Sequence, residues 1–285
     1  MKSIDKVATA VRLMDEHLRA ELLIKDGALQ AKKLWENTYI KKQIDKRLNS
    51  GTFTIQDHIR AMVYSMLSSG ASWNRVEPGI DINTGRITHI DEIFCQYDVD
   101  TLLNTDPMML VEKIKGQTLG TQYTKNQMFA LIEDNIPQML SLEKEYGSID
   151  NFYQYFISAD TSLRTLILIL SANDSKYKYA QMGEALIAEY LRNVGYDIAK
   201  PDRHIRRILG SKVLGCSNSE ITPINEAFDL VTEIAKVTGK PIAEVDYILW
   251  SYCATGYGEV CTVKRPKCTI CVAHKLCNHL YNAEV

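Results

Sequence analysis

The sequence predicts an all-α protein. Apolar residues recur at helical spacing through residues 3–24. The stripe consists of Ile4, Val7, Val11, Met14, Leu18 and Leu22. Helix-start signals recur downstream at Asp106-Pro107, Thr222-Pro223 and Lys240-Pro241. Strand-like alternation is slight and falls in the turn-rich residues 77–92, which could form a small hairpin.

Further helices are expected in order along the chain. A second amphipathic segment, residues 28–48, follows the break at Asp26-Gly27, and an apolar helix from His58 to Leu67 opens after Thr54. The almost uninterrupted apolar run 163–170 indicates a buried helix. The remaining expected helices cover residues 98–104, 107–115, 125–144, 148–157, 184–194, 221–238 and 241–253.

The composition is that of an ordinary globular protein. The 285 residues are enough for one large domain or two modest ones, with 46% hydrophobic and 24% charged residues. No stretch approaches the roughly 18 uncharged apolar residues of a membrane span, so no membrane partner is expected. Residues 1–30 mix charged and apolar positions and resemble no signal or transit peptide, which favours the reduced cytosol.

The net charge of −2 does not by itself indicate a nucleic-acid-binding protein, but the cations are clustered. One cluster contains Lys200, Arg203, His204, Arg206, Arg207 and Lys212. The other contains Lys264, Arg265, Lys267, His274, Lys275 and His279. A basic face on a slightly acidic body is typical of a DNA enzyme, although any cytosolic protein can cluster charges by chance.

Four of the seven cysteines fall near the C-terminus with the spacing C-x6-C-x2-C-x5-C. They are Cys261, Cys268, Cys271 and Cys277. Disulfides are disfavoured in the expected reducing compartment. Structural zinc sites usually offer two short C-x2-C or C-x2-H pairs, whereas this run has one such pair and wider outer loops. The spacing alone therefore favours a [4Fe–4S] cluster modestly over zinc.

The residues around these cysteines resemble a known family. The lead-in Gly256-Tyr-Gly258-Glu-Val-Cys261 and the segment Arg265-Pro-Lys-Cys268 look like the iron–sulfur loop of the endonuclease III and adenine-glycosylase group. That group belongs to the helix-hairpin-helix DNA glycosylase superfamily. The resemblance implies a structural [4Fe–4S] cluster on the four cysteines. It also implies that Lys264, Arg265 and Lys267 meet DNA phosphates; a solvated basic loop is the alternative.

A second segment, Gly195 to Gly210, resembles the family's Pro-Asp segment, in which a helix starts at an aspartate followed by a histidine two residues later. Asp202 and His204 occupy those positions. Pro201 and Asp202 also suit a plain helix cap, which is the alternative role. The resemblance implies that Asp202 is catalytic, since a carboxylate can stabilise positive charge on the sugar as the base leaves. Arg203, His204, Arg206 and Arg207 are then expected to face DNA.

The expected phosphate-binding hairpin lies within residues 171–183 and departs from the family pattern. The usual Gly-x-Gly is reduced to Met182-Gly183, so Lys176 and Lys178 are candidate replacements that bind DNA through point charges. Bifunctional members carry a lysine after the hairpin that attacks the sugar. Here that register holds Glu184 or Ala185.

Two further positions concern insertion into the duplex. The loop before residue 125 resembles the family's wedge loop, with Gln122 and Tyr123 at its predicted tip; an ordinary interhelical loop is an equal alternative. Gly70 stands where the family often has a glutamine, and Trp73 could fill that role. The insertion at 77–92 is either a surface loop or a specificity element.

Together these resemblances imply two helical domains with a DNA-binding cleft between them. A six-helix barrel with a degenerate hairpin would cover residues 53–195, and an iron–sulfur domain would join residues 1–52 with 196–285. The implied function is base excision from double-stranded DNA containing a damaged or modified base, by a monomeric, cytoplasmic, nucleoid-associated and monofunctional DNA glycosylase. A bifunctional glycosylase/AP lyase and a non-catalytic iron–sulfur DNA-binding protein are the alternatives.

Overall fold

The computed structural model describes residues 2–24, 31–70, 73–158 and 163–279. Within these ranges the regular structure is helical, and the only strand-like pairing is one isolated antiparallel bridge between Ile80 and Ile87. The all-α prediction is therefore confirmed. Backbone contacts divide the chain into two compact units, residues 1–41 with 197–285 and residues 42–196. Among the described helices, none combines the length and the apolar character needed to cross a bilayer.

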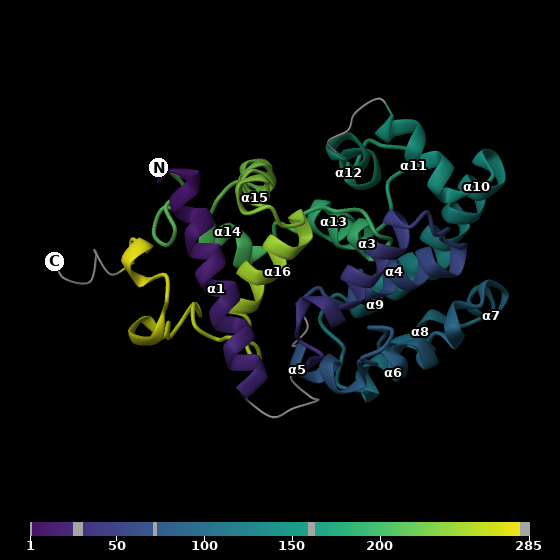
Figure 1. Ribbon diagram of the computed structural model, residues 1–285. Coiled ribbons are helices and arrows are strands. Elements are labelled where there is room, and N and C mark those ends of the chain that lie inside the picture. The colour runs from purple at the N-terminus through teal and green to yellow at the C-terminus, as the bar shows by residue number, and fades with distance from the viewer. Residues whose placement is uncertain (1, 25–30, 71–72, 159–162, 280–285) are drawn as a thin grey trace. The chain divides into compact units, whose positions relative to one another are not determined.

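The first unit is built on four helices. They are α1 (Ile4–Ile24), α14 (Arg203–Leu209), α15 (Ile224–Thr238) and α16 (Ile242–Cys253). Helices α1 and α14 each pack against both α15 and α16 (Figure 1). In the predicted apolar stripe of α1, Ile4 is half-buried and Val7, Val11, Met14 and Leu18 are buried, so helical spacing identified the face that enters the core.

The start of α16 is fixed from outside the helix. Pro241 precedes the first turn and has no N–H to leave unpaired. The carboxylate of Asp197 accepts hydrogen bonds from the backbone N–H groups of Ile242 (3.0 Å) and Ala243 (2.8 Å). These bonds satisfy helix-terminal donors and place a negative charge at the positive end of the helix dipole. The segment that begins at Asp197 is thereby attached to α16.

The second unit contains the remaining helices. After α3 (Tyr39–Leu48), which begins in the first unit, they are α4 (Ile55–Leu67), α5 (Trp73–Val76), α6 (Thr88–Ile93), α7 (Val99–Leu103), α8 (Pro107–Gly116), α9 (Thr124–Phe129), α10 (Ile136–Tyr146), α11 (Ile149–Ile157), α12 (Arg164–Ser171) and α13 (Glu184–Asn193). Helix α4 is almost wholly buried and packs against α13. Its N-terminus is closed by a capping box between Thr54 and Asp57.

A π-helical segment joins α9 to α10. Residues 124–146 form one continuous helical stretch, as predicted for 125–144, but Ala130–Asn135 adopts π-helical hydrogen bonding. Pro137, at the start of α10, cannot donate a backbone hydrogen bond, and this favours a local change of helical pitch. The side chain of buried Asn135 is paired with both backbone groups of Ala180 (2.7 and 3.1 Å).

Two predicted elements differ from the structure. The helix predicted for 28–48 is helical as α3 only from Tyr39, after the short 3-10 turn Trp35–Asn37, because the extended Thr38 separates them; residues 28–30 lie outside the described ranges. The hairpin predicted for 77–92 is reduced to the bridge between Ile80 and Ile87. The chain then turns into α6, because the Tyr64 hydroxyl accepts from the N–H of Ile87 and donates to Asp91.

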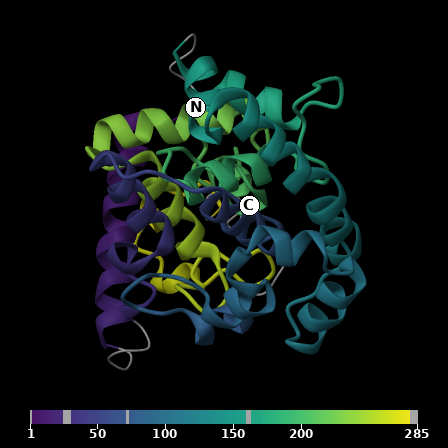
Figure 2. The same cartoon turned by 90° about the vertical axis from the view of Figure 1, so that its right-hand side faces the viewer.

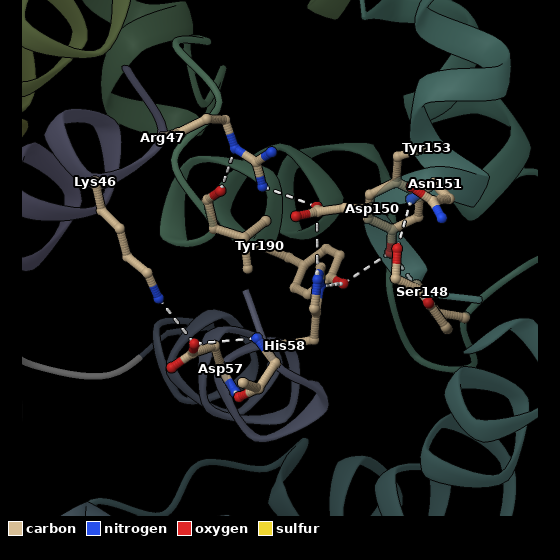
Figure 3. Close-up of polar contacts among 12 residues, drawn as sticks. Lys46, Arg47, Asp57, His58, Ser148, Asp150, Asn151, Tyr153 and Tyr190 are labelled. Carbon is tan, nitrogen blue, oxygen red and sulfur yellow. Dashed lines mark hydrogen bonds and ion pairs between the residues drawn. The ribbon is translucent and has the colours of Figure 1, made fainter. Parts of the chain in front are cut away.

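A buried polar cluster ties α4, α11 and α13 together (Figure 3). The hydroxyl of Tyr190 lies 2.6 Å from Nδ1 of the fully buried His58 and 2.7 Å from the hydroxyl of Tyr153. Asp150 lies 3.7 Å from Nε2 of His58 and pairs with Arg47 at 2.9 Å. Burial lowers the pKa of His58 to about 4, against the opposing attraction of Asp150, so the ring is neutral at pH 7.

This burial predicts acid-sensitive folding. The unfolded chain takes up a proton on His58 below about pH 6.5, whereas the folded protein does so only near pH 4. The free energy of unfolding should therefore fall as the pH drops from about 6.5 to 4, by up to roughly 3 kcal/mol. Urea unfolding of the wild type and His58→Gln at pH 7 and 4.5 measures this contribution. Equal pH slopes for the two proteins would contradict it.

Candidate metal centre and its neighbouring helix

The chain after α16 forms an irregular loop that carries the four clustered cysteines. The loop folds back onto the end of α16, where the carbonyl of Tyr252 accepts from the N–H groups of both Val260 and Cys261 at 3.0 Å (yellow, Figure 2). Lys267 N–H donates to the Val260 carbonyl at 2.8 Å, which closes the loop between the first two cysteines. Two 3-10 turns, Cys268–Ile270 and His274–Leu276, follow.

All four cysteines, Cys261, Cys268, Cys271 and Cys277, line one cavity of about 230 Å³. At roughly 30 Å³ per molecule in liquid water, this space is several times larger than one water or one metal ion. In the described part of the chain, no three His, Cys, Asp or Glu side chains come close enough to hold a single metal ion. The four cysteines therefore share one cavity, and four cysteines that lose their protons on binding are a donor set suited to a [4Fe–4S] cluster.

Several donors point at the sulfur atoms. The Tyr252 hydroxyl donates to Cys271 Sγ at 3.4 Å, and the N–H of His279 donates to Cys277 Sγ at 3.4 Å. Hydrogen bonds of this kind stabilise thiolates and influence the potential of a cluster bound to them. Helix α16 and the cysteine loop itself therefore each provide a hydrogen-bond donor to one of the four sulfurs.

Arg207 makes the closest charged contact with the cysteines. Its guanidinium lies 3.6 Å from Cys261 Sγ and 3.4 Å from Cys253 Sγ, and it also donates to the Cys261 carbonyl. A hydrogen bond from Cys253 and the charge of Arg207 lower the pKa of Cys261 to about 6, although burial opposes them. Cys261 is thus a thiolate at neutral pH, the form that binds metals.

Helix α14 connects this centre with Asp202. Asp202 is the N-cap of α14 and accepts from the N–H groups of His204 (2.8 Å) and Ile205 (3.2 Å). Both bonds end on Oδ1, so the cap does not use Oδ2. Arg207 follows on the same helix, which therefore carries the candidate catalytic carboxylate at its start and the cysteine contact further along. The capping role is present, and the catalytic role stays a prediction.

His204 differs from a simple surface histidine. Its side chain is half-buried, and Nδ1 is buried without a hydrogen-bond partner in the described residues. Burial lowers the pKa of His204, while the neighbouring Asp202 opposes this change. A neutral ring next to Asp202 is the consequence at pH 7.

The predicted DNA-binding cations of this unit are not equivalent. Lys264, Arg265 and Lys267 are exposed on the loop between the first two cysteines, and Arg203 is exposed on α14. Arg206 already makes one hydrogen bond within the protein, since its Nε donates to the Thr222 carbonyl at 2.7 Å. Arg207 is directed at the cysteines, as described above. The exposed side chains can reach a phosphate without losing a protein contact, except for Lys267, which has Glu259 at 3.7 Å.

The predicted wedge residues lie at an exposed turn of the second unit. Gln122 and Tyr123 are both exposed, Tyr123 to 47%. Thr121 N–H donates to the Thr124 hydroxyl at 2.8 Å, and this bond holds the backbone that carries the two exposed side chains. A Cβ added at Gly70, which has φ +77°, would lie 4.0 Å from Thr121 Cγ2. The end of α4 and the turn are therefore neighbours, and Trp73 begins α5 shortly after.

The connection between α12 and α13 is a long loop held by side chains of the preceding helices. Gln138 donates to the Tyr177 carbonyl at 2.6 Å, and Asn135 pairs with Ala180. Lys176 is exposed and lies 4.6 Å from the Tyr177 ring, whereas Lys178 donates to Asn173.

Gly183 is exposed at the N-cap of α13, followed by Glu184 and Ala185 in the register of the lyase lysine. A Cβ at Gly183 would meet nothing within 4 Å. The open space at this helix start is compatible with an approaching phosphate, but it does not select one.

Sequence reasoning missed two residues of the metal centre. Cys253 is buried next to Arg207, and Arg207, which was predicted to face DNA, contacts the sulfurs of Cys253 and Cys261. Arg207 lies five residues after the cap, and this position alone does not tell whether its side chain points to DNA or to the cysteines. The packing of α14 on α16 decides between them. No spacing rule links Cys253 to Cys261.

No protein-family model, curated protein or solved structure matches this chain.

The Arg207 contact predicts a specific defect. Arg207→Lys keeps a positive charge but cannot reach two sulfurs and a carbonyl together. The purified variant should hold less metal, and its free energy of unfolding should fall by about 2 kcal/mol, the usual cost of losing a charged hydrogen bond. Elemental analysis and urea unfolding check this, with Arg206→Lys as the matched control on the same helix. Equal metal content in both variants would contradict the role.

Proposed function

We propose that the chain is a DNA N-glycosylase that carries a structural [4Fe–4S] cluster and removes a damaged or modified base from double-stranded DNA. The observation that carries this proposal is the shared cavity of Cys261, Cys268, Cys271 and Cys277, contacted by Arg207 from the helix that Asp202 starts. The two segments of family resemblance are thereby neighbours in one unit. The cluster, when bound, would hold the loop that presents Lys264 and Arg265.

The proposed chemistry is hydrolysis of the N-glycosidic bond. As the base leaves, positive charge develops on the sugar, and the carboxylate of Asp202 stabilises it or takes a proton from the attacking water. The use of only Oδ1 in the cap leaves Oδ2 for this task. The N-terminus of α14 favours the ionised carboxylate. The exposed Gln122 and Tyr123 would enter the space left by the flipped base.

The lack of a lysine at Glu184 and Ala185 supports a monofunctional enzyme. A Schiff base with the sugar requires an amine, which neither side chain offers. A bifunctional enzyme that uses Lys176 is the second candidate, favoured by the exposure of that amine. Lys178 is less suited because its ammonium group donates to Asn173. A non-catalytic iron–sulfur DNA-binding protein would be distinguished by tight binding without excision across a panel of modified bases.

The cluster assignment predicts a brown protein. Anaerobically purified protein should contain about four iron and about four acid-labile sulfide per chain. Cys268→Ser should lower solubility before it lowers chemistry, because the proposed cluster is structural. Stoichiometric zinc without sulfide would refute the cluster and leave the four thiolates as a zinc site.

The catalytic role of Asp202 predicts a separable loss of excision. Asp202→Asn retains an oxygen that can cap α14 but removes the charge. Excision from a panel of modified-base duplexes should fall roughly a hundred- to a thousandfold, which corresponds to about 3–4 kcal/mol. Binding to a duplex that already lacks the base should survive, which excludes misfolding as the cause. Full excision by the variant would return Asp202 to the capping role alone.

The monofunctional assignment is tested with the same substrates. The product strand should stay intact until alkali is added, and borohydride should trap no covalent complex. A trapped complex that disappears in Lys176→Ala but persists in Lys178→Ala would establish the bifunctional alternative.

A further inference from the structure

Cys253 is a fifth cysteine at the metal centre. It is the last residue of α16, is only 3% exposed, and does not belong to the described lining of the cysteine cavity. One guanidinium nitrogen of Arg207 lies 3.4 Å from Cys253 Sγ and 3.6 Å from Cys261 Sγ, so the two sulfurs meet at the same donor. Cys253, which is not a proposed ligand, therefore lies close to Cys261, which is one.

The backbone holds the two cysteines together independently of any cofactor. The Cys261 N–H donates to the carbonyl of Tyr252, the residue before Cys253, at 3.0 Å. Gly258 N–H donates to the Ser251 carbonyl at 3.0 Å and further ties the intervening loop to α16. Disulfides require neighbouring backbones and side chains that point at one another. The backbone bond to Tyr252 brings the two chain segments together, and both side chains point at the same nitrogen of Arg207.

We propose that Cys253 and Cys261 form a redox-sensitive pair, which closes to a disulfide when no cluster is bound. The proposal rests on the proposed cluster for one point only, namely that a bound cluster occupies the Cys261 sulfur and prevents the reaction. The oxidant is a low-molecular-weight disulfide of the glutathione type. The oxidised pair removes one of the four ligands and so prevents the cluster from being rebuilt until a thiol reduces it.

The reaction proceeds by two thiol–disulfide exchanges. The Cys261 thiolate, held beside Arg207, attacks one sulfur of the small disulfide, breaks its S–S bond and releases one small thiolate. The Cys253 sulfur then attacks Cys261 in the mixed disulfide. Its proton passes to the second small thiol, which leaves as the Cys253–Cys261 bond forms. Two protein thiols are oxidised and one small disulfide is reduced to two thiols, so atoms and electrons balance.

Arg207 gives this pair an advantage over the other cysteines of the loop. A guanidinium beside the attacking sulfur stabilises its thiolate, which is the reactive form, and also the developing charge on the leaving sulfur. The Cys268 and Cys271 thiols of the C-x2-C segment could also form a disulfide, but the sulfurs that Arg207 contacts within the described residues are those of Cys253 and Cys261. The buried Cys253 is suited to resolve a mixed disulfide because its sulfur meets the same guanidinium as that of Cys261.

The test uses the full chain, purified anaerobically and then incubated with oxidised glutathione and an iron chelator. Iron release is followed by absorbance, and the cysteines are mapped by mass spectrometry of proteolytic peptides under non-reducing conditions. The wild type should lose its metal and gain about one disulfide per chain, joining Cys253 to Cys261. Dithiothreitol should reverse it, and reconstitution with iron and sulfide should succeed only after that reduction.

Matched variants identify each step. In Cys253→Ser the first exchange still occurs but nothing resolves it, so a glutathione adduct should remain on Cys261. Cys253→Ala should behave identically, and helical circular dichroism checks that both variants fold. Cys216→Ser removes another buried cysteine of the same unit and should leave the Cys253–Cys261 disulfide unchanged.

Two results would overturn the proposal. One is a wild-type protein in which Cys261 keeps the glutathione adduct while Cys253 remains a free thiol. The other is a disulfide between Cys268 and Cys271 with Cys253 unmodified. Absence of iron and sulfide from the purified protein would instead refute the proposed cofactor. Peptide mapping would still decide whether the two thiols react, so the two failures are distinguishable.

Discussion

The contact between Arg207 and Cys261 is the constraint on which the first unit depends. Cys261 is mostly buried, and its thiolate would be costly to bury without a nearby cation. Arg207 provides the charge and also donates to the Cys261 carbonyl, so it fixes the backbone and the sulfur together. Removing it leaves the Cys261 thiolate without its charged hydrogen-bond donor.

Helix α16 is the frame that makes this contact possible. At its N-terminus it is capped by Asp197, and the carboxylate of Asp246 in its middle accepts from the backbone of Lys200. At its C-terminus the Tyr252 carbonyl holds the start of the cysteine loop. The segment that leads to Asp202 and the loop that leads to Cys261 are therefore attached to opposite ends of one helix, and α14 packs against it between them. A shift of α16 would disturb both proposed functional elements at once.

The elements that the sequence predicted well are those set by local rules. Cap residues such as Asp106 and Ser148, and prolines at helix starts, fix boundaries because they satisfy or remove terminal N–H groups within a few residues. The predicted hairpin is present only as the antiparallel bridge between Ile80 and Ile87, and the Tyr64 hydroxyl, distant in sequence, binds Ile87 and Asp91 where α6 begins. The direction of Arg207 was equally out of reach, since it depends on sulfur atoms that lie 46 and 54 residues away in the chain.

The connection between α12 and α13 bears on whether the proposed enzyme could have lyase activity. Asn135 and Gln138 bind the backbone of this loop, so its shape is set by polar side chains and not by a glycine-rich turn. Glu184 then starts α13, where an acidic side chain favours the helix dipole but repels a phosphate. A carboxylate in this register cannot form a Schiff base. In the proposed glycosylase, Asp202 is the carboxylate assigned to hydrolysis, and Glu184 and Ala185 supply no amine in the register of the lyase lysine.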